Sequence, residues 1–140
     1  MILRATVIGL FLSLAMLAAE QRDSHFVVLP ETEAHEAPVG AGGGWMPPQL
    51  DIDRLEVHLP ELPVFNPYSY YRQYVGVIIS GRKLIYVNAQ CNKPESVPIN
   101  PEDDWRRHLR IVMDGGKCIW HALYDPATGR FSDFMFNGVA

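Results

Sequence analysis

Two cysteines, Cys91 and Cys118, are the residues of this sequence with the clearest chemistry. In an oxidising compartment an isolated pair of cysteines is usually joined in a disulfide. We therefore expect a structural bridge that closes a loop of about 28 residues, worth about 3.5 kcal/mol in the chain-entropy model. The alternative is a pair of reactive thiols, but the Cys-x-x-Cys spacing typical of redox sites is missing.

The histidines do not form a metal-binding pattern. No two are spaced as His-x-x-x-His or His-Glu-x-x-His, and none has the spacing to a cysteine that a zinc site requires. His121 belongs to an expected buried strand, where a hydrogen-bonded core histidine is the simpler interpretation. We therefore predict no metal ligand and no cofactor. The histidines are His25, His35, His58, His108 and His121.

No nucleophile stands out either. Catalysis by serine or cysteine requires an oriented base beside the nucleophile, and no serine lies in a Gly-x-Ser-x-Gly motif. Asp103 and Asp104 are adjacent and project from different sides of a helix, so they do not form a general acid/base pair. We predict no catalytic residue. A small secreted hydrolase remains the alternative, because a catalytic site can assemble from distant residues.

Two clusters could bind a partner. Tyr68, Tyr70, Tyr71 and Arg72 have the composition of an interface core, so we mark them as a candidate partner surface. The alternative is that these rings cap the open end of a sheet. The second cluster is basic, and it reads either as a site for an acidic partner or as a solvated helix face. Its members are Arg106, Arg107 and Arg110.

These side chains must be held by a β-rich domain over residues 68–140. Two β-rich runs, Tyr74–Ile79 and Lys83–Ala89, flank a glycine-containing turn and predict a hairpin. Asn100-Pro101-Glu102 predicts the start of a short helix. The remaining strands are expected over Arg110–Met113, Lys117–Tyr124 and Arg130–Asn137. The expected fold class is α+β, mostly β, with an antiparallel sheet of about five strands and one short helix.

Residues 20–67 have the composition of an acidic, proline- and glycine-rich arm that is largely disordered. The glycine run 40–44 reads as a linker, because it lacks the flanking strand, helix and lysine of a phosphate-binding loop. Leu55, Val57 and Leu59 alternate, which favours an edge strand or an unpaired extended segment.

Charge is divided unevenly along the chain. Residues 20–67 carry nine acidic and two basic residues, whereas residues 68–140 carry seven acidic and nine basic ones. Nucleic-acid binding requires a basic face, so the acidic balance argues against a nucleic-acid partner.

The first residues read as an export signal. Arg4 is followed by an apolar run from Ala5 to Ala19, after which the chain turns polar. The run is shorter than the roughly twenty residues that cross a bilayer. We expect residues 1–19 to be a signal peptide, the mature protein to be periplasmic or secreted, and no stable membrane insertion after cleavage. The alternative is an uncleaved N-terminal anchor.

The C-terminal half also carries a resemblance. Its residues are the run Leu84 to Ala89 with Cys91, the Asp114-Gly115-Gly116 turn with Cys118, and the stretches Tyr124 to Phe131 and Asn137-Gly138. Together they are similar to a group of uncharacterised small exported bacterial proteins. The resemblance implies export and supplies no activity. We therefore expect a non-catalytic binding or accessory module of the cell envelope, with an envelope protein as its partner.

Overall fold

The computed structural model describes residues 25–94, 104–112 and 115–138. The predicted signal peptide (1–19), residues 20–24 of the predicted arm and residues 100–103 of the predicted helix lie outside these ranges. The α-helix is α2 (Gln49–His58), and short 3-10 turns are η1 (Glu31–Glu36), η2 (Leu59–Glu61), η3 (Pro67–Ser69) and η5 (Gly116–Cys118). The strands are β1 (Phe26–Val28), β2 (Gly43–Trp45), β3 (Tyr71–Ile79), β4 (Arg82–Gln90), β5 (Ile119–Asp125) and β6 (Arg130–Phe136).

The six strands form one sheet in the order β1-β3-β4-β5-β6, and β2 also pairs with β3. The predicted class, mostly β with one short helix, is confirmed. The sheet is mixed rather than wholly antiparallel, because β1 runs parallel to β3 while the other pairs are antiparallel. Within the described residues, no helix is long and apolar enough to cross a membrane.

The predicted hairpin is confirmed. β3 and β4 pair over nine residues each, from Tyr71 opposite Gln90 to Ile79 opposite Arg82. Ser80 and Gly81 join them with φ values of 50° and 75°. Positive φ at both positions is the geometry of the tight two-residue turn that matches the twist of a hairpin.

The predicted disulfide is confirmed as well. Cys91 and Cys118 are bonded, with Cα atoms 4.9 Å apart. The bridge joins the segment after β4 to the start of β5, and the amide of Cys91 donates to the carbonyl of Cys118 at 2.8 Å. It therefore holds together two strands that lie side by side in the sheet.

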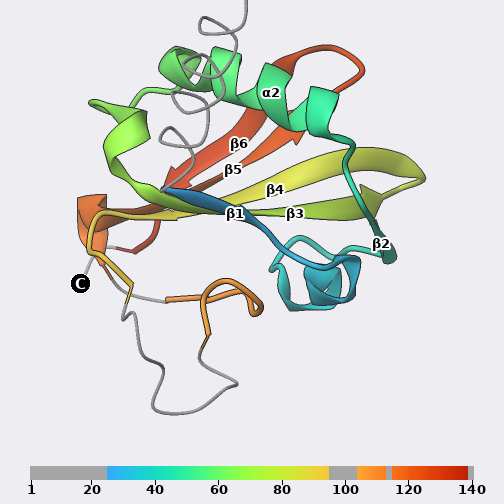
Figure 1. The fold of residues 1–140 in the computed structure, drawn as a ribbon, viewed down its shortest axis with the longest axis horizontal. Helices are drawn as coiled ribbons and strands as arrows, with labels where there is room; N and C mark the ends of the chain where they lie inside the picture. Colours follow the sequence, from blue (N-terminus) through green and yellow to red (C-terminus); the bar gives the residue numbers. More distant parts are fainter. Residues whose placement is uncertain (1–24, 95–103, 113–114, 139–140) are drawn as a thin grey trace, which may run out of the picture.

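The prediction of a largely disordered arm over residues 20–67 is wrong for residues 25–67. This segment supplies β1, β2 and α2, and α2 lies across one face of the sheet (Figure 1). Ile52, Leu55 and Leu59 follow helical spacing and are buried to 1% exposure or less. Burying a side chain of this size contributes about 1.5–3 kcal/mol, which offsets the entropy of ordering the segment.

The alternation of Leu55, Val57 and Leu59 does not make a strand. Val57 lies on the outer side of α2 with 73% of its surface exposed, while Leu55 and Leu59 are fully buried. Leu55 and Leu59 are four residues apart, so they lie on one face of a helix, but the same spacing also fits a strand. Three apolar residues at alternate positions therefore cannot distinguish the helical period from the strand period.

The glycine run is not a linker, because β2 begins at Gly43. A Cβ on Gly44 would lie 2.2 Å from the carbonyl oxygen of Glu31, and one on Gly76 of β3 would lie 2.0 Å from the carbonyl oxygen of Trp45. Glycine at these two positions lets η1, β2 and β3 approach closely.

The helix and strand expected between residues 100 and 113 are absent from residues 104–112. Side chains of the sheet satisfy this backbone instead. Gln73 Nε2 donates to the carbonyls of Trp105 and His108 at 2.6 and 2.7 Å, and Asn88 Nδ2 donates to that of Arg110 at 2.7 Å. With η1, the segment covers the sheet face opposite α2.

A register shift in β6 keeps its phenylalanines on one side. The shift lies opposite His121 and Leu123, and Asp133 has a φ of 53°. The extra residue resets the alternation, so that the rings pack against the core cluster under α2. These rings are Phe131, Phe134 and Phe136.

Candidate functional site

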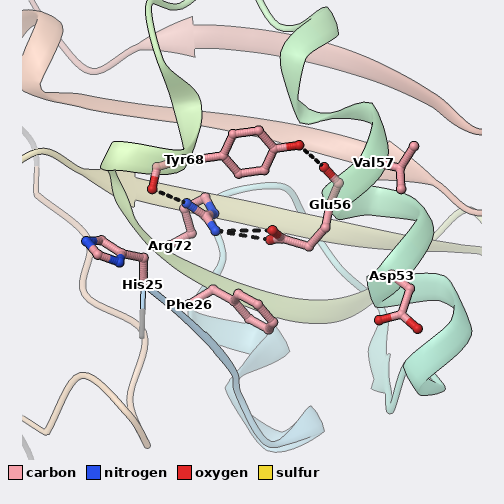
Figure 2. A pocket seen from close by; sticks show the side chains of 7 residues that line it. All are labelled: His25, Phe26, Asp53, Glu56, Val57, Tyr68 and Arg72. Atoms are coloured by element: carbon pink, nitrogen blue, oxygen red, sulfur yellow. Dashed lines mark hydrogen bonds and ion pairs between the residues drawn. The ribbon is translucent and has the colours of Figure 1, made fainter. Parts of the chain in front are cut away.

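A groove of about 550 Å³ lies between β1, α2 and the η3 turn (Figure 2). β1 contributes one wall, α2 contributes the opposite wall, and β3 contributes the floor. We call this the β1–α2 groove. Its lining residues are His25, Phe26, Asp53, Glu56, Val57, Tyr68 and Arg72.

The floor is built around Arg72 on β3, which is only 2% exposed. Its Nε donates to the hydroxyl of Tyr74 at 2.8 Å. Nη2 donates to both carboxylate oxygens of Glu56 on α2, at 3.2 and 3.3 Å. Nη1 donates to the carbonyls of Pro67, Tyr68 and Tyr70, at 3.2, 3.1 and 2.9 Å.

These contacts saturate the guanidinium, which has five N–H donors and no acceptor. Glu56 is equally occupied, because it also accepts the hydroxyl of Tyr74. Burial raises the pKa of Tyr74 well above its ordinary value, and the negative charge of Glu56 raises it further, against the lowering effect of Arg72. The floor is therefore a closed, charge-balanced network that fastens α2 to β3 and to the η3 turn.

Two rings sandwich the guanidinium. The carbon at its centre lies 5.8 Å from the ring centroids of both Phe26 and Tyr68 (Figure 2). Such cation–π contacts contribute about 0.5–2 kcal/mol each. The Tyr68 hydroxyl donates to the backbone carbonyl of Glu56 at 2.6 Å, which fixes the ring over the groove. Tyr68 is nevertheless 43% exposed, and with Val57 it gives the groove an apolar, accessible wall.

One acidic side chain that pairs with no cation among the described residues stands at the rim of the groove. Asp53 is exposed on α2, where its Oδ1 accepts from Gln49 Nε2 at 2.9 Å. On the opposite wall His25 stacks on Tyr71, with ring centroids 4.7 Å apart.

The structure brings two of the four predicted surface residues, Tyr68 and Arg72, together in the groove and places Tyr70 and Tyr71 elsewhere. Tyr70 and Tyr71 are consecutive in extended backbone, so their rings point to opposite faces. The ring of Tyr70 packs on Trp120, with the ring centroids 5.8 Å apart, whereas the ring of Tyr71 contacts His25 and Trp105. Arg72 lines the groove floor, but its contacts within the protein leave it only 2% exposed. Tyr68 alone of the four forms an exposed wall of the groove.

The predicted basic cluster lies in the 104–112 segment on the sheet face opposite α2. Arg106 and Arg107 are exposed, and Arg107 lies 3.7 Å from the carboxylate of Asp104. The neighbouring His108 and the amide of Leu109 both bind the buried carboxylate of Glu33, at 2.9 Å each. An acidic residue of the N-terminal segment thus anchors this basic segment to η1.

The histidines have structural partners. His58 Nδ1 lies 3.0 Å from Glu61 Oε1, and His121 Nδ1 lies 2.6 Å from Asn137 Oδ1. Ser69, beside the groove, donates to the carbonyl of Asn66 at 2.8 Å. Among the residues that the structure describes, no three His, Cys, Asp or Glu side chains are grouped to hold a metal ion.

A second, more open hollow of about 630 Å³ lies beside the β3–β4 turn and the start of α2. Two of its polar groups have partners: Arg82 forms an ion pair with Asp125, and the Trp45 indole donates to the carbonyl of Leu84 at 2.8 Å. Lys83 Nζ lies 5.6 Å from the Trp45 ring. Met46 is an exposed apolar side chain there as well, but the β1–α2 groove is the better candidate, because it is the more enclosed of the two and lies beside the edge strand β1.

Sequence reasoning missed Phe26, Asp53, Glu56 and Val57, since all four fall in the segment taken for an arm. The helical spacing of the buried residues of α2 is the signal that could have found it. Comparison with known proteins adds no assignment: no family model matches this chain, and no curated protein or solved structure matches it significantly.

Proposed function

We propose that this protein is a non-catalytic binding module exported to the cell envelope, and that it holds a partner protein in the β1–α2 groove. One observation carries the proposal. Exposed apolar groups, Val57 and Tyr68, stand over a floor whose charged groups are fully paired inside the protein. Such a preformed surface supports binding by contact and burial.

The saturated floor weighs against a hydrolase at this groove. A catalytic acid, base or anion-binding arginine needs a donor or acceptor that can turn to the substrate. Arg72 and Glu56 already direct all of theirs at each other, at Tyr74 and at backbone carbonyls.

Export remains part of the proposal. The disulfide between Cys91 and Cys118 is compatible with an oxidising compartment. The predicted signal peptide and the resemblance to small exported bacterial proteins support the same location. The acidic N-terminal half supports a protein partner over a nucleic acid.

Site-specific crosslinking tests the proposal. A photo-crosslinking amino acid replaces Val57 in the groove or, as the matched control, Glu36 on η1, whose side chain is 56% exposed on the other face of the sheet. The proteins are exported and irradiated in intact cells. We expect one discrete adduct from position 57 and none from position 36. Equal adducts from both positions, or none from position 57, would contradict the proposal.

A further inference from the structure

β1 is an edge strand, and among residues 25–94, 104–112 and 115–138 only its inner side is paired. The carbonyl of His25 accepts from the amide of Arg72, and the amide of Leu29 donates to the carbonyl of Tyr74, both at 2.7 Å. Backbone groups of a strand alternate between its two sides, so His25, Val27 and Leu29 face β3. Phe26 and Val28 direct their N–H and C=O groups away from the sheet.

This outer side is open for pairing. Within the described residues, the N–H and C=O groups of Phe26 and Val28 have no hydrogen-bond partner. Both residues are half-buried, and both side chains pack against the core cluster on the α2 side. Unpaired groups at a sheet edge are a template for a further strand.

The β1–α2 groove lies beside this same edge. Phe26 belongs to β1 and also lines the groove, while Asp53 and Val57 line it from α2 (Figure 2). Side chains of an added strand would alternate in direction. Every second one would enter the space between Phe26 and Val57, where apolar contact is available. In strand addition, backbone hydrogen bonds to the sheet edge provide affinity and pockets for alternate side chains provide specificity. Here the edge of β1 offers the hydrogen bonds and the groove offers the pocket.

Charge then selects the occupant. Of the charged residues that line the groove, Glu56 and Arg72 pair with each other, so the exposed carboxylate of Asp53 is the charge left at the rim and favours a cationic group in the ligand. The same edge of a second copy, residues 25–29, holds no lysine or arginine that could face Asp53, so charge complementarity favours a different partner.

We propose that the free edge of β1 binds an extended peptide segment of a partner protein by strand addition. The segment carries an apolar side chain in the groove and a lysine or arginine that faces Asp53. This inference rests on the proposed function and deepens it by naming the chemistry of the partner.

A displayed library of random peptides, selected on the exported full chain with its disulfide formed, provides the probes. We expect enriched peptides with alternating apolar residues and a flanking lysine or arginine. On binding, hydrogen exchange at the amides of Phe26 and Val28 slows. N-methylation of alternate peptide backbone nitrogens preserves the side chains and weakens binding by about tenfold or more.

Variants of the protein separate the two components. Val28→Pro removes an outward N–H and leaves the pairing to β3 intact, which proline permits at a sheet edge. Val28→Ala is its control, because it trims the side chain but keeps the donor. Asp53→Asn weakens binding roughly threefold, as expected for one exposed charge, whereas Glu36→Gln, the charge-matched control, leaves it unchanged.

Each contrary result has a distinct meaning. If peptides perturb Tyr68 but leave exchange at Phe26 and Val28 unchanged, strand addition is wrong and groove binding stands. Enrichment of no peptide alongside a crosslink from position 57 also overturns strand addition and spares the proposed function. Enrichment of acidic peptides overturns the assigned charge. Failure of both the peptide selection and the crosslink overturns both proposals.

Discussion

The Glu56 carboxylate lies 3.2 Å from Nη2 of Arg72 and joins α2 to β3 across sixteen residues of sequence. This ion pair links two secondary-structure elements at the floor of the groove. Arg72 is buried with Tyr74 beside it, so this network adds polar contacts to the apolar packing that holds the α2 wall on the sheet.

Glu56→Gln should therefore destabilise the fold. The substitution removes the counter-charge of a buried guanidinium, which costs about 3–5 kcal/mol in a fully buried pair. Because the Glu56 side chain is 22% exposed, we expect a smaller loss of about 2 kcal/mol. Urea unfolding measures it. Glu61→Gln, which breaks the exposed pair with His58, should change the free energy by less than about 0.5 kcal/mol. Equal effects of the two variants would refute a structural role for the Arg72 network.

Stability should fall in alkaline solution. Burial raises the pKa of Tyr86 to about 12, from 10.0 for a free tyrosine, and burial also raises the pKa of Tyr74. The folded state thus keeps protons that the unfolded state releases. The Tyr86 contribution is fully present below pH 10 and is lost as pH rises from 10 to about 12, at most about 1.4 kcal/mol per pH unit.

Unfolding free energies measured across this pH range check the prediction. Tyr86→Phe should flatten the alkaline decline while leaving the neutral-pH value within about 1 kcal/mol of the parent. A decline as steep in the variant as in the parent would show that Tyr86 does not cause it.

The disulfide should contribute substantially. Replacing Cys91 and Cys118 together by serine releases the loop between β4 and β5, and the chain-entropy model predicts a loss of about 3.5 kcal/mol. Thermal unfolding of the double variant measures this loss against the parent treated with and without reductant. If reductant lowered the melting temperature of the variant as much as that of the parent, the effect would not arise from the bridge.

Local signals in the sequence were enough for the long hairpin and the disulfide. Ser80-Gly81 between two β-branched runs specifies a turn through its own backbone requirements. The pairing of Cys91 with Cys118 follows from there being only two cysteines. Fold class follows from the same strands, which are neighbours in both sequence and space.

Local sequence signals could not predict the candidate site, because the residues that form it are distant in sequence. Nothing local pairs Phe26 with β3 in a parallel strand or Glu56 with Arg72. In the sequence Gly44 resembles a linker residue. Only the fold shows that a Cβ at this position would lie 2.2 Å from the carbonyl oxygen of Glu31. Composition marked residues 25–67 as unable to fold alone, and they order by pairing β1 and β2 with β3 and by packing α2 on the sheet.

Val57 offers the sharpest separation of binding from folding. With 73% of its surface exposed, Val57→Asp should change the unfolding free energy by less than about 0.5 kcal/mol while placing a charge on the groove wall. Leu50→Asp is the matched control, because Leu50 is 59% exposed on the same helix and does not line the groove.

The most direct test of the groove as the binding site is the yield of crosslinked adduct from an aromatic photo-crosslinking residue placed at Tyr68. We predict that Val57→Asp lowers this yield by about tenfold, the cost of roughly 1.4 kcal/mol of lost contact and desolvation, and that Leu50→Asp leaves it unchanged. An adduct that forms equally well in both backgrounds would contradict the assignment of the β1–α2 groove as the binding site.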